Sequence, residues 1–206
     1  MSFVPALRRV AECERPTLST HAVGDISRSS VEAFIRTVYA RRFGANLLHF
    51  APTLVSLRDQ NGVLAAAGYR SAGTGRLFLE TYLEAPIEQV LASHHCVAPA
   101  RARIVEVGHL AAARAGEGLR LVRLLAPHLA ALGFHWVVCT LTEELRHLFE
   151  RLGVAPLVLG RADPAALGDR ARYWGRYYEH HPMVLAGHLP RALQQLTPHA
   201  ASSGLR

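Results

Sequence analysis

A short stretch near the middle of the chain combines residue types that could transfer an acyl group to an amine. This chemistry needs a base that takes a proton from the ammonium group and donors that stabilise the oxyanion of the intermediate. Glu106 and His109 lie in the segment from Arg103 to Ala111, which is apolar and rich in β-branched residues and therefore predicts a strand. We expect Glu106 to be the base, directly or through water, with His109 as a second candidate.

The period of a strand separates these two side chains. Successive residues point to opposite faces, so we expect Glu106 to share a face with Gly108 and Leu110, while His109 points the other way. The two side chains are therefore not expected to act as one direct pair. Both also have structural alternatives: His109 as a hydrogen-bonding core residue, and Glu106 as a carboxylate paired with an arginine. The candidate partners of Glu106 are Arg70, Arg101 and Arg103.

A glycine-rich turn follows this strand and precedes an apolar helix predicted from about Leu119 to Leu132. The first amides of a helix have no earlier carbonyl to bind, and together with the helix dipole they attract an anion. The junction therefore predicts a site for the pyrophosphate of CoA or the phosphate of a phosphopantetheine arm, with an ordinary strand-to-helix turn as the alternative. The residues that we place in this site are Arg114, Gly116, Glu117, Gly118, Leu119 and Arg120.

The composition predicts one folded domain with a preference for acidic partners. Half of the 206 residues are apolar and 19% are charged, so the chain can bury enough surface to offset its ordering entropy. Its 23 basic residues are all arginine and outnumber the 16 acidic ones, giving a net charge of +7. This balance favours an acyl carrier protein, a phosphate-bearing cofactor or an anionic membrane surface as partner. No run of basic residues marks a nucleic-acid patch, so we expect no nucleic-acid partner.

Several other chemistries lack their sequence signatures. Cys13, Cys96 and Cys139 form no C-x-x-C motif, and the 12 histidines show no metal-ligand spacing, so we predict neither a disulfide framework nor a metal site. The chain also has no G-x-S-x-G elbow for a serine nucleophile. No signal-peptide pattern or apolar run approaching ~18 residues is present. Reduced thiols and a cytoplasmic location are the resulting expectations.

The order of predicted elements indicates an α/β (α+β) fold, a mixed sheet flanked by helices. Residues 1–28 are expected to form an arm with one short strand, 29–190 the domain and 191–206 a tail. The elements follow in this order: a helix capped by Ser29 or Ser30 and ending near Gly44, a hairpin of 53–58 and 63–70, a short helix from Pro86, a strand at 103–111, a helix at 119–132, a strand at 134–140, a helix from Thr142 to Leu152, a strand at 155–159 and an edge segment at 183–189.

Aromatic residues gather in a long insertion at 160–181. Trp174, Tyr177 and Tyr178, together with Thr140 at the end of a predicted strand, are candidates for the wall of an acyl or acceptor pocket. The aromatic residues could equally pack in the core or lie at a membrane interface beside neighbouring arginines.

Several stretches together resemble the thermostable hemolysin family across roughly residues 35–188. They are YARRFGA at 39–45, FAPTL at 50–54, AAGYR at 66–70, LFLETYL at 77–83, IVEVG at 104–108, WVVCT at 136–140, FERLG at 149–153 and WGRYY at 174–178. The resemblance implies a GNAT-like fold with a mixed, mostly antiparallel central sheet. The glycine turn resembles the GNAT motif [QR]-x-x-G-x-[GA] at Gly116 and Gly118, but Ala113 occupies the first position and Arg114 follows one place late.

The layout is also similar, more distantly, to the acyl-homoserine-lactone synthases. This similarity implies N-acyl transfer from acyl carrier protein or acyl-CoA to a small amine or amino-acid-type acceptor, with the thioester as co-substrate and no tightly bound cofactor. It places Arg70 and Glu106 in the catalytic region. The chemistry of N-acylation leaves Glu80 and Glu84 as alternative bases. A membrane-active protein, or a non-catalytic GNAT-like binding module, is the competing hypothesis.

Overall fold

The described strands form one mixed sheet. The computed structural model describes residues 17–94 and 97–196. The sheet has seven strands in the order β1-β2-β3-β4-β5-β7-β6, and its neighbours are antiparallel except β4 and β5. The bounds are β1 Thr17–His21, β2 Thr53–Asp59, β3 Gly62–Ser71, β4 Ile104–Ala112, β5 Trp136–Leu141, β6 Leu157–Arg161 and β7 Met183–His188. This is the mostly antiparallel, GNAT-like sheet that the sequence predicts.

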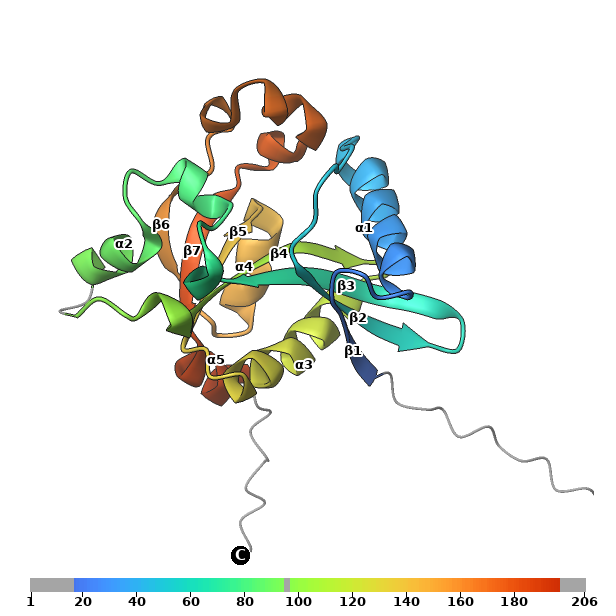
Figure 1. Ribbon diagram of the computed structural model, residues 1–206, viewed down its shortest axis with the longest axis horizontal. Helices are drawn as coiled ribbons and strands as arrows, with labels where there is room; N and C mark the ends of the chain where they lie inside the picture. The colour runs from blue at the N-terminus through green and yellow to red at the C-terminus, as the bar shows by residue number, and fades with distance from the viewer. Residues whose placement is uncertain (1–16, 95–96, 197–206) are drawn as a thin grey trace, which may run out of the picture.

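Helices cover both faces of this sheet (Figure 1). One face carries α1, α2 and the 160–181 segment, and the other carries α3 with α5. The bounds are α1 Arg28–Phe43, α2 Ile87–His94, α3 Glu117–Ala131, α4 Glu143–Arg151 and α5 Leu189–Leu196, with short 3-10 segments that include Leu79–Tyr82, Pro164–Trp174 and Tyr177–His180. Apolar side chains on each face of the sheet meet these helices, so two layers of core enclose it.

The predicted elements are present in the predicted order, with three differences. Met183–His188 is not an edge strand, because β7 lies between β5 and β6 and β6 forms the edge. The first helix begins at Arg28, so Ser29 and Ser30 lie in its first turn rather than capping it. The short strand predicted in the arm is β1, which pairs with β2, but no helix was predicted at the start of the tail, where α5 packs on α3 through residues such as Leu189. Cys13 and Cys96 lie outside the described residues.

β4 and β5 stay together over a short distance only. Their parallel ladder joins Ile104–Val107 to Trp136–Cys139 and ends there, although β4 continues to Ala112 and β5 to Leu141. β5 remains paired with β7 up to Leu141, and β4 remains paired with β3 up to Ala112. The middle of the sheet therefore opens beyond Val107.

The aromatic segment docks on the end of α1 through a glycine. Gly175 has φ 53, and its backbone lies directly against the end of α1. A Cβ added to Gly175 would lie 2.7 Å from the Gly44 carbonyl carbon and would collide with the Phe43 carbonyl oxygen. The neighbouring Arg176 amide donates to that Phe43 oxygen over 2.7 Å. Any side chain at position 175 would separate these two segments.

We expect Gly175→Ala to destabilise the protein more than Gly168→Ala does. The two glycines have nearly the same backbone angles, with φ 53 and 54, but an added Cβ at Gly168 meets nothing within 4 Å. Gly168→Ala should therefore cost about 1–3 kcal/mol for its backbone conformation alone, and Gly175→Ala about 1–3 kcal/mol more for the clash. Urea unfolding of both variants measures the difference; equal losses would show that close packing at Gly175 is unimportant.

Candidate functional site

A cavity of about 380 Å³ opens where β4 and β5 part. Its wall includes residues from both faces of the sheet, such as Phe50 and Trp174 on the α1 side and Leu125 and Leu129 on the α3 side. Apolar side chains make up most of the lining. The described polar or charged side chains on it include Arg42, His49, Arg70, Glu106, His109, Thr140, Thr142 and Arg170.

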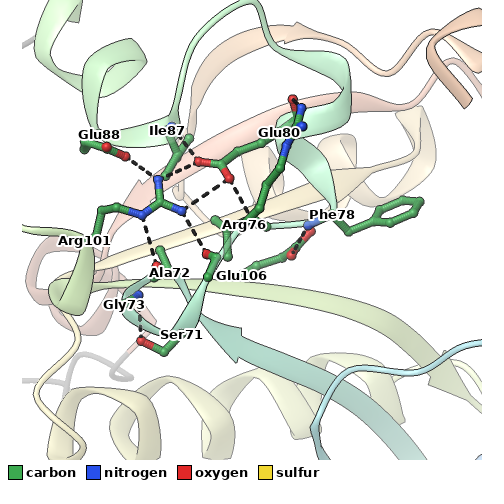
Figure 2. A network of polar contacts seen from close by, with 12 residues as sticks. Ser71, Ala72, Gly73, Arg76, Phe78, Glu80, Ile87, Glu88, Arg101 and Glu106 are labelled. Carbon is green, nitrogen blue, oxygen red and sulfur yellow. Dashed lines mark hydrogen bonds and ion pairs between the residues drawn. The ribbon is translucent and has the colours of Figure 1, made fainter.

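Glu106 lies on this wall with its carboxylate held by backbone amides. One oxygen accepts a hydrogen bond from the Phe78 amide at 2.8 Å (Figure 2), and the other accepts from the Leu79 amide at 2.9 Å. Burial raises the pKa of Glu106 above the usual 4.5, and the amide bonds and the charge of Arg70 oppose this rise only in part. A desolvated carboxylate in a fixed orientation is a stronger base than one in water.

Arg70 faces Glu106 across the β3–β4 ladder, because the two residues are directly paired. The ion pair considered as the structural alternative for Glu106 is not formed between these two described residues. Arg70 instead donates to the carbonyl of Arg76 at 3.3 Å. The other candidate partners of Glu106 are also engaged elsewhere: Arg101 binds Glu80 and Glu88, and Arg103 binds the Gly133 carbonyl.

A β-bulge brings His109 to the face of Glu106, so the predicted alternation is wrong. Gly108 pairs with Gly68 and Ala111 with Ala66, which leaves His109 and Leu110 opposite a single β3 residue. His109 has φ 55, and its Nδ1 lies 3.3 Å from the Cβ position of Gly68. Leu110 packs with the α3 cluster on the far face.

Burial keeps the His109 ring neutral. It lowers the pKa of His109 from 6.5 to about 4; the charges of Arg70 and Arg28 act in the same direction, and a contact with the His49 backbone opposes them. The ring packs against Phe50 with centroids 5.4 Å apart, and its buried Nδ1 has no hydrogen-bond partner among the described residues. At pH 7 His109 is therefore a neutral polar group and a weaker base than Glu106.

Glu80, an alternative acid–base candidate, lies outside the cavity lining and is fully engaged in structure. The side chain is 4% exposed and accepts from the amides of Leu77 and Ile87, at 2.8 and 2.9 Å, and from Arg101 at 2.7 Å (Figure 2). Burial alone would raise the pKa of Glu80, but these hydrogen bonds lower it below 4.5. This geometry suits a structural carboxylate.

The predicted anion site has free helix amides. Gly116 has φ 89 and precedes α3 without a side-chain cap. The Glu117 amide donates to the Arg114 carbonyl, and the Arg120 amide donates to the Gly116 carbonyl. The amides of Gly118 and Leu119, between them in the first turn, have no earlier helical carbonyl to bind. Gly118 lines the cavity, whereas the exposed Arg120 lies 3.9 Å from Glu117.

The predicted pocket residues lie together, although one of them is behind the wall. Thr140, Trp174 and Tyr177 line the cavity, and the Tyr177 hydroxyl donates to the Thr140 carbonyl at 3.3 Å. Tyr178 is not part of the lining. Its hydroxyl shares a 2.6 Å hydrogen bond with the hydroxyl of Tyr82, and Tyr82 does line the cavity. Sequence reasoning missed Tyr82, Phe50 and the Phe78 and Leu79 amides, whose stretches carried no signal beyond the family resemblance.

Other chemical sites are not found in the described part of the chain. No group of histidine, cysteine, aspartate and glutamate residues there could hold a metal ion. Cys139 lines the cavity, but burial raises the pKa of its thiol to about 12, which keeps it protonated. None of the described helices combines the length and the apolar character needed to cross a bilayer.

Solved structures with this arrangement of strands define the class of fold. The acyl-homoserine-lactone synthase LasI is 14% identical, with 93% of this chain and 99% of LasI covered and a TM-score of 0.61. FeeM, an N-acyl amino acid synthase from uncultured soil microbes, is 14% identical over 87% of this chain and 96% of FeeM, with a TM-score of 0.58. BjaI is a CoA-dependent acyl-homoserine lactone synthase whose structure contains SAM and isopentyl-CoA. It is 12% identical over 88% of this chain and 87% of BjaI, with a TM-score of 0.61. The fold is therefore the GNAT-like fold of these synthases.

The chain belongs to the thermostable hemolysin family, whose model matches residues 21–193. This match confirms the resemblance seen in the sequence. No curated protein matches the chain.

We expect Glu80→Gln to lower the free energy of unfolding by about 3 kcal/mol at pH 7, because it removes the buried charge that pairs with the half-buried Arg101 guanidinium. The folded-state pKa of Glu80 is depressed, so its stabilising effect is present above pH 4.5 and is lost as the pH falls through the folded value. The difference between wild type and variant should therefore shrink in acid. Urea unfolding between pH 7 and 3 tests this.

Glu88→Gln is the matched control. Glu88 also pairs with Arg101, but its side chain is 23% exposed, so its loss should cost at most about 1 kcal/mol. An equal effect of the two variants, or a difference that does not change with pH, would contradict the structural role assigned to Glu80.

Proposed function

We propose that this protein is an N-acyltransferase that moves an acyl group from an acyl thioester to a small amine. The observation that carries the proposal is the cavity at the parting of β4 and β5, which joins an apolar space to a desolvated carboxylate at Glu106. The known synthases that share the fold support acyl transfer as the class of reaction.

The thioester would enter along the open edge of β4. The Gly118 and Leu119 amides at the start of α3 suit the pyrophosphate of CoA or the phosphate of a carrier-bound phosphopantetheine. Beyond Val107 the backbone of β4 that faces β5 is free of that ladder, and its amides can bind the thioester carbonyl and the oxyanion. The acyl chain would occupy the apolar part of the cavity beside Leu125 and Leu129.

Glu106 would act on the amine. An ammonium group cannot attack a carbonyl, so Glu106 first accepts a proton from it. The nitrogen then forms a bond to the thioester carbon, the C–S bond breaks, and the departing thiolate takes the second proton released by the nitrogen. Glu106 suits this step better than His109, because burial raises the proton affinity of the carboxylate and lowers that of the imidazole.

Free acyl-CoA and acyl carrier protein both remain candidate donors, because either presents the same phosphopantetheine arm. Arg114, Arg120 and Arg123 near the start of α3 are exposed and add positive charge for an acidic partner. A cytoplasmic location stays a prediction.

We expect acyl thioesters to bind and Gly116→Asp to abolish the binding. An Asp side chain has room at Gly116 but places a negative charge where the phosphate would lie. Gly116→Asn imposes the same backbone demand without the charge and should keep most of the affinity. Native mass spectrometry against a panel of acyl-CoAs and acyl carrier proteins measures both; no binding of any donor to the wild type would defeat the proposal.

The rate should depend on the ionisation of Glu106. Since the carboxylate must be deprotonated to act, kcat/KM is expected to rise with pH through a pKa above 4.5 and then to level off, within the limits set by the acceptor amine. Glu106→Gln keeps the shape and should lower kcat by about 100-fold or more and remove this rise. A rise that persists unchanged in the variant would assign the base to another group.

A further inference from the structure

The charged side chains at the polar end of the cavity are neighbours of opposite sign that do not pair. Arg70 and Glu106 are cross-strand partners, so their Cβ atoms are about 5 Å apart on one face. Glu106 is held by the Phe78 and Leu79 amides, and Arg70 by the Arg76 carbonyl. Within the described residues Arg70 takes part in no ion pair. Each group therefore keeps hydrogen-bonding capacity for a ligand.

The remaining charges of the lining do not change this pattern. Glu106 is the acidic residue among the described lining residues. Arg42 is paired with Glu144, Arg170 is exposed, and the ring of His109 is neutral at pH 7. The polar end, where Arg70 and Glu106 are both half-buried, thus presents one positive and one negative group side by side.

On the basis of the acyl transfer proposed above, we propose that the acceptor is a free α-amino acid with an uncharged side chain, whose carboxylate binds Arg70 and whose ammonium group faces Glu106. An α-amino acid carries its two charges on adjacent positions of one carbon, which matches two cross-strand neighbours. A guanidinium binds a carboxylate through two parallel hydrogen bonds, and burial strengthens them. A simple amine would leave the half-buried Arg70 guanidinium without an anion to bind.

The walls select the side chain of this amino acid. Phe50, Phe78 and Trp174 line the cavity, and the rings of Phe78 and Trp174 lie 5.6 Å apart. These surfaces favour an apolar side chain. A basic side chain would add a positive charge near Arg70, and the lining residues that the structure describes contain no second carboxylate to balance it.

The product of this reaction is an N-acyl amino acid and a free thiol. The new bond joins the amino nitrogen to the acyl carbon, the C–S bond breaks, and the amino acid carboxylate remains unreacted on Arg70. The thiolate takes up one of the two protons lost by the ammonium group, and Glu106 holds the other.

Acceptor preference tests the inference. The full-length protein is supplied with a donor thioester and with L-leucine, leucinamide, 3-methylbutylamine, lysine or S-adenosylmethionine, and the initial rate of acylated product is measured by mass spectrometry. Leucine should have the highest kcat/KM, about 10- to 100-fold above leucinamide and 3-methylbutylamine, which lack the carboxylate. Preference for either of these, for lysine or for S-adenosylmethionine would overturn the assignment.

Variants of Arg70 locate the effect. Arg70→Gln should lower kcat/KM for leucine about 10- to 100-fold more than kcat/KM for 3-methylbutylamine. Arg70→Lys, which keeps the charge without the planar fork, should show a smaller difference between the two acceptors. Arg58→Gln, at the end of β2 and outside the lining, should change neither. Thioester binding that matches the wild type confirms that each variant is folded.

The outcomes separate the two proposals. Equal loss with leucine and 3-methylbutylamine in Arg70→Gln would overturn the amino-acid site and leave acyl transfer standing. Bound thioester with no acylated product from any acceptor would overturn acyl transfer itself, and the amino-acid site with it.

Discussion

The course of β4 determines where this protein can do chemistry. In a complete sheet the strands lie about 5 Å apart and their backbone groups are paired, so nothing can pass between them. Here β5 leaves β4 after Val107 while β4 stays with β3, and the two backbones separate. The bulge at His109 and Leu110 begins directly beyond this point. The opening and the unusual position of His109 therefore arise in the same few residues of one strand.

The base depends on a second buried carboxylate that does no chemistry. Glu80 binds the Leu77 amide and, with Arg101, fixes the turn in which the next two amides, those of Phe78 and Leu79, point at Glu106. A buried carboxylate is costly unless its lone pairs are satisfied. The lone pairs of Glu80 are satisfied by the Leu77 and Ile87 amides and by the Arg101 guanidinium. Because these contacts order the turn, the Phe78 and Leu79 amides are held where they orient Glu106 without neutralising its charge. Arg70 thereby forms no ion pair with Glu106 and donates instead to the Arg76 carbonyl.

Local sequence signals were enough for most elements and for part of the site. The turn at residues 59–62, the glycines at 116 and 133 and the apolar periods correctly located the hairpin, α3 and β5, because these signals act within a few residues. The interior position of β7 and the face of His109 could not be predicted in this way. The first depends on which distant strand β7 joins, and the second on an extra residue in the β3–β4 ladder that reverses the alternation. The roles of Glu80 and Glu106 likewise depend on partners 21 to 28 residues away.

The proposed reaction also gives a physical meaning to the name of the family. An N-acyl amino acid has an anionic carboxylate at one end and an alkyl chain at the other, so it is an amphiphile. Each methylene that enters a bilayer stabilises the bound state by about 0.8 kcal/mol, and the charged head keeps such a molecule at the interface, where it disturbs lipid packing. Under the proposed reaction, a disturbance of a bilayer would come from the product, whose formation requires Glu106 and Arg70 on the cavity wall, rather than from an apolar surface on the protein.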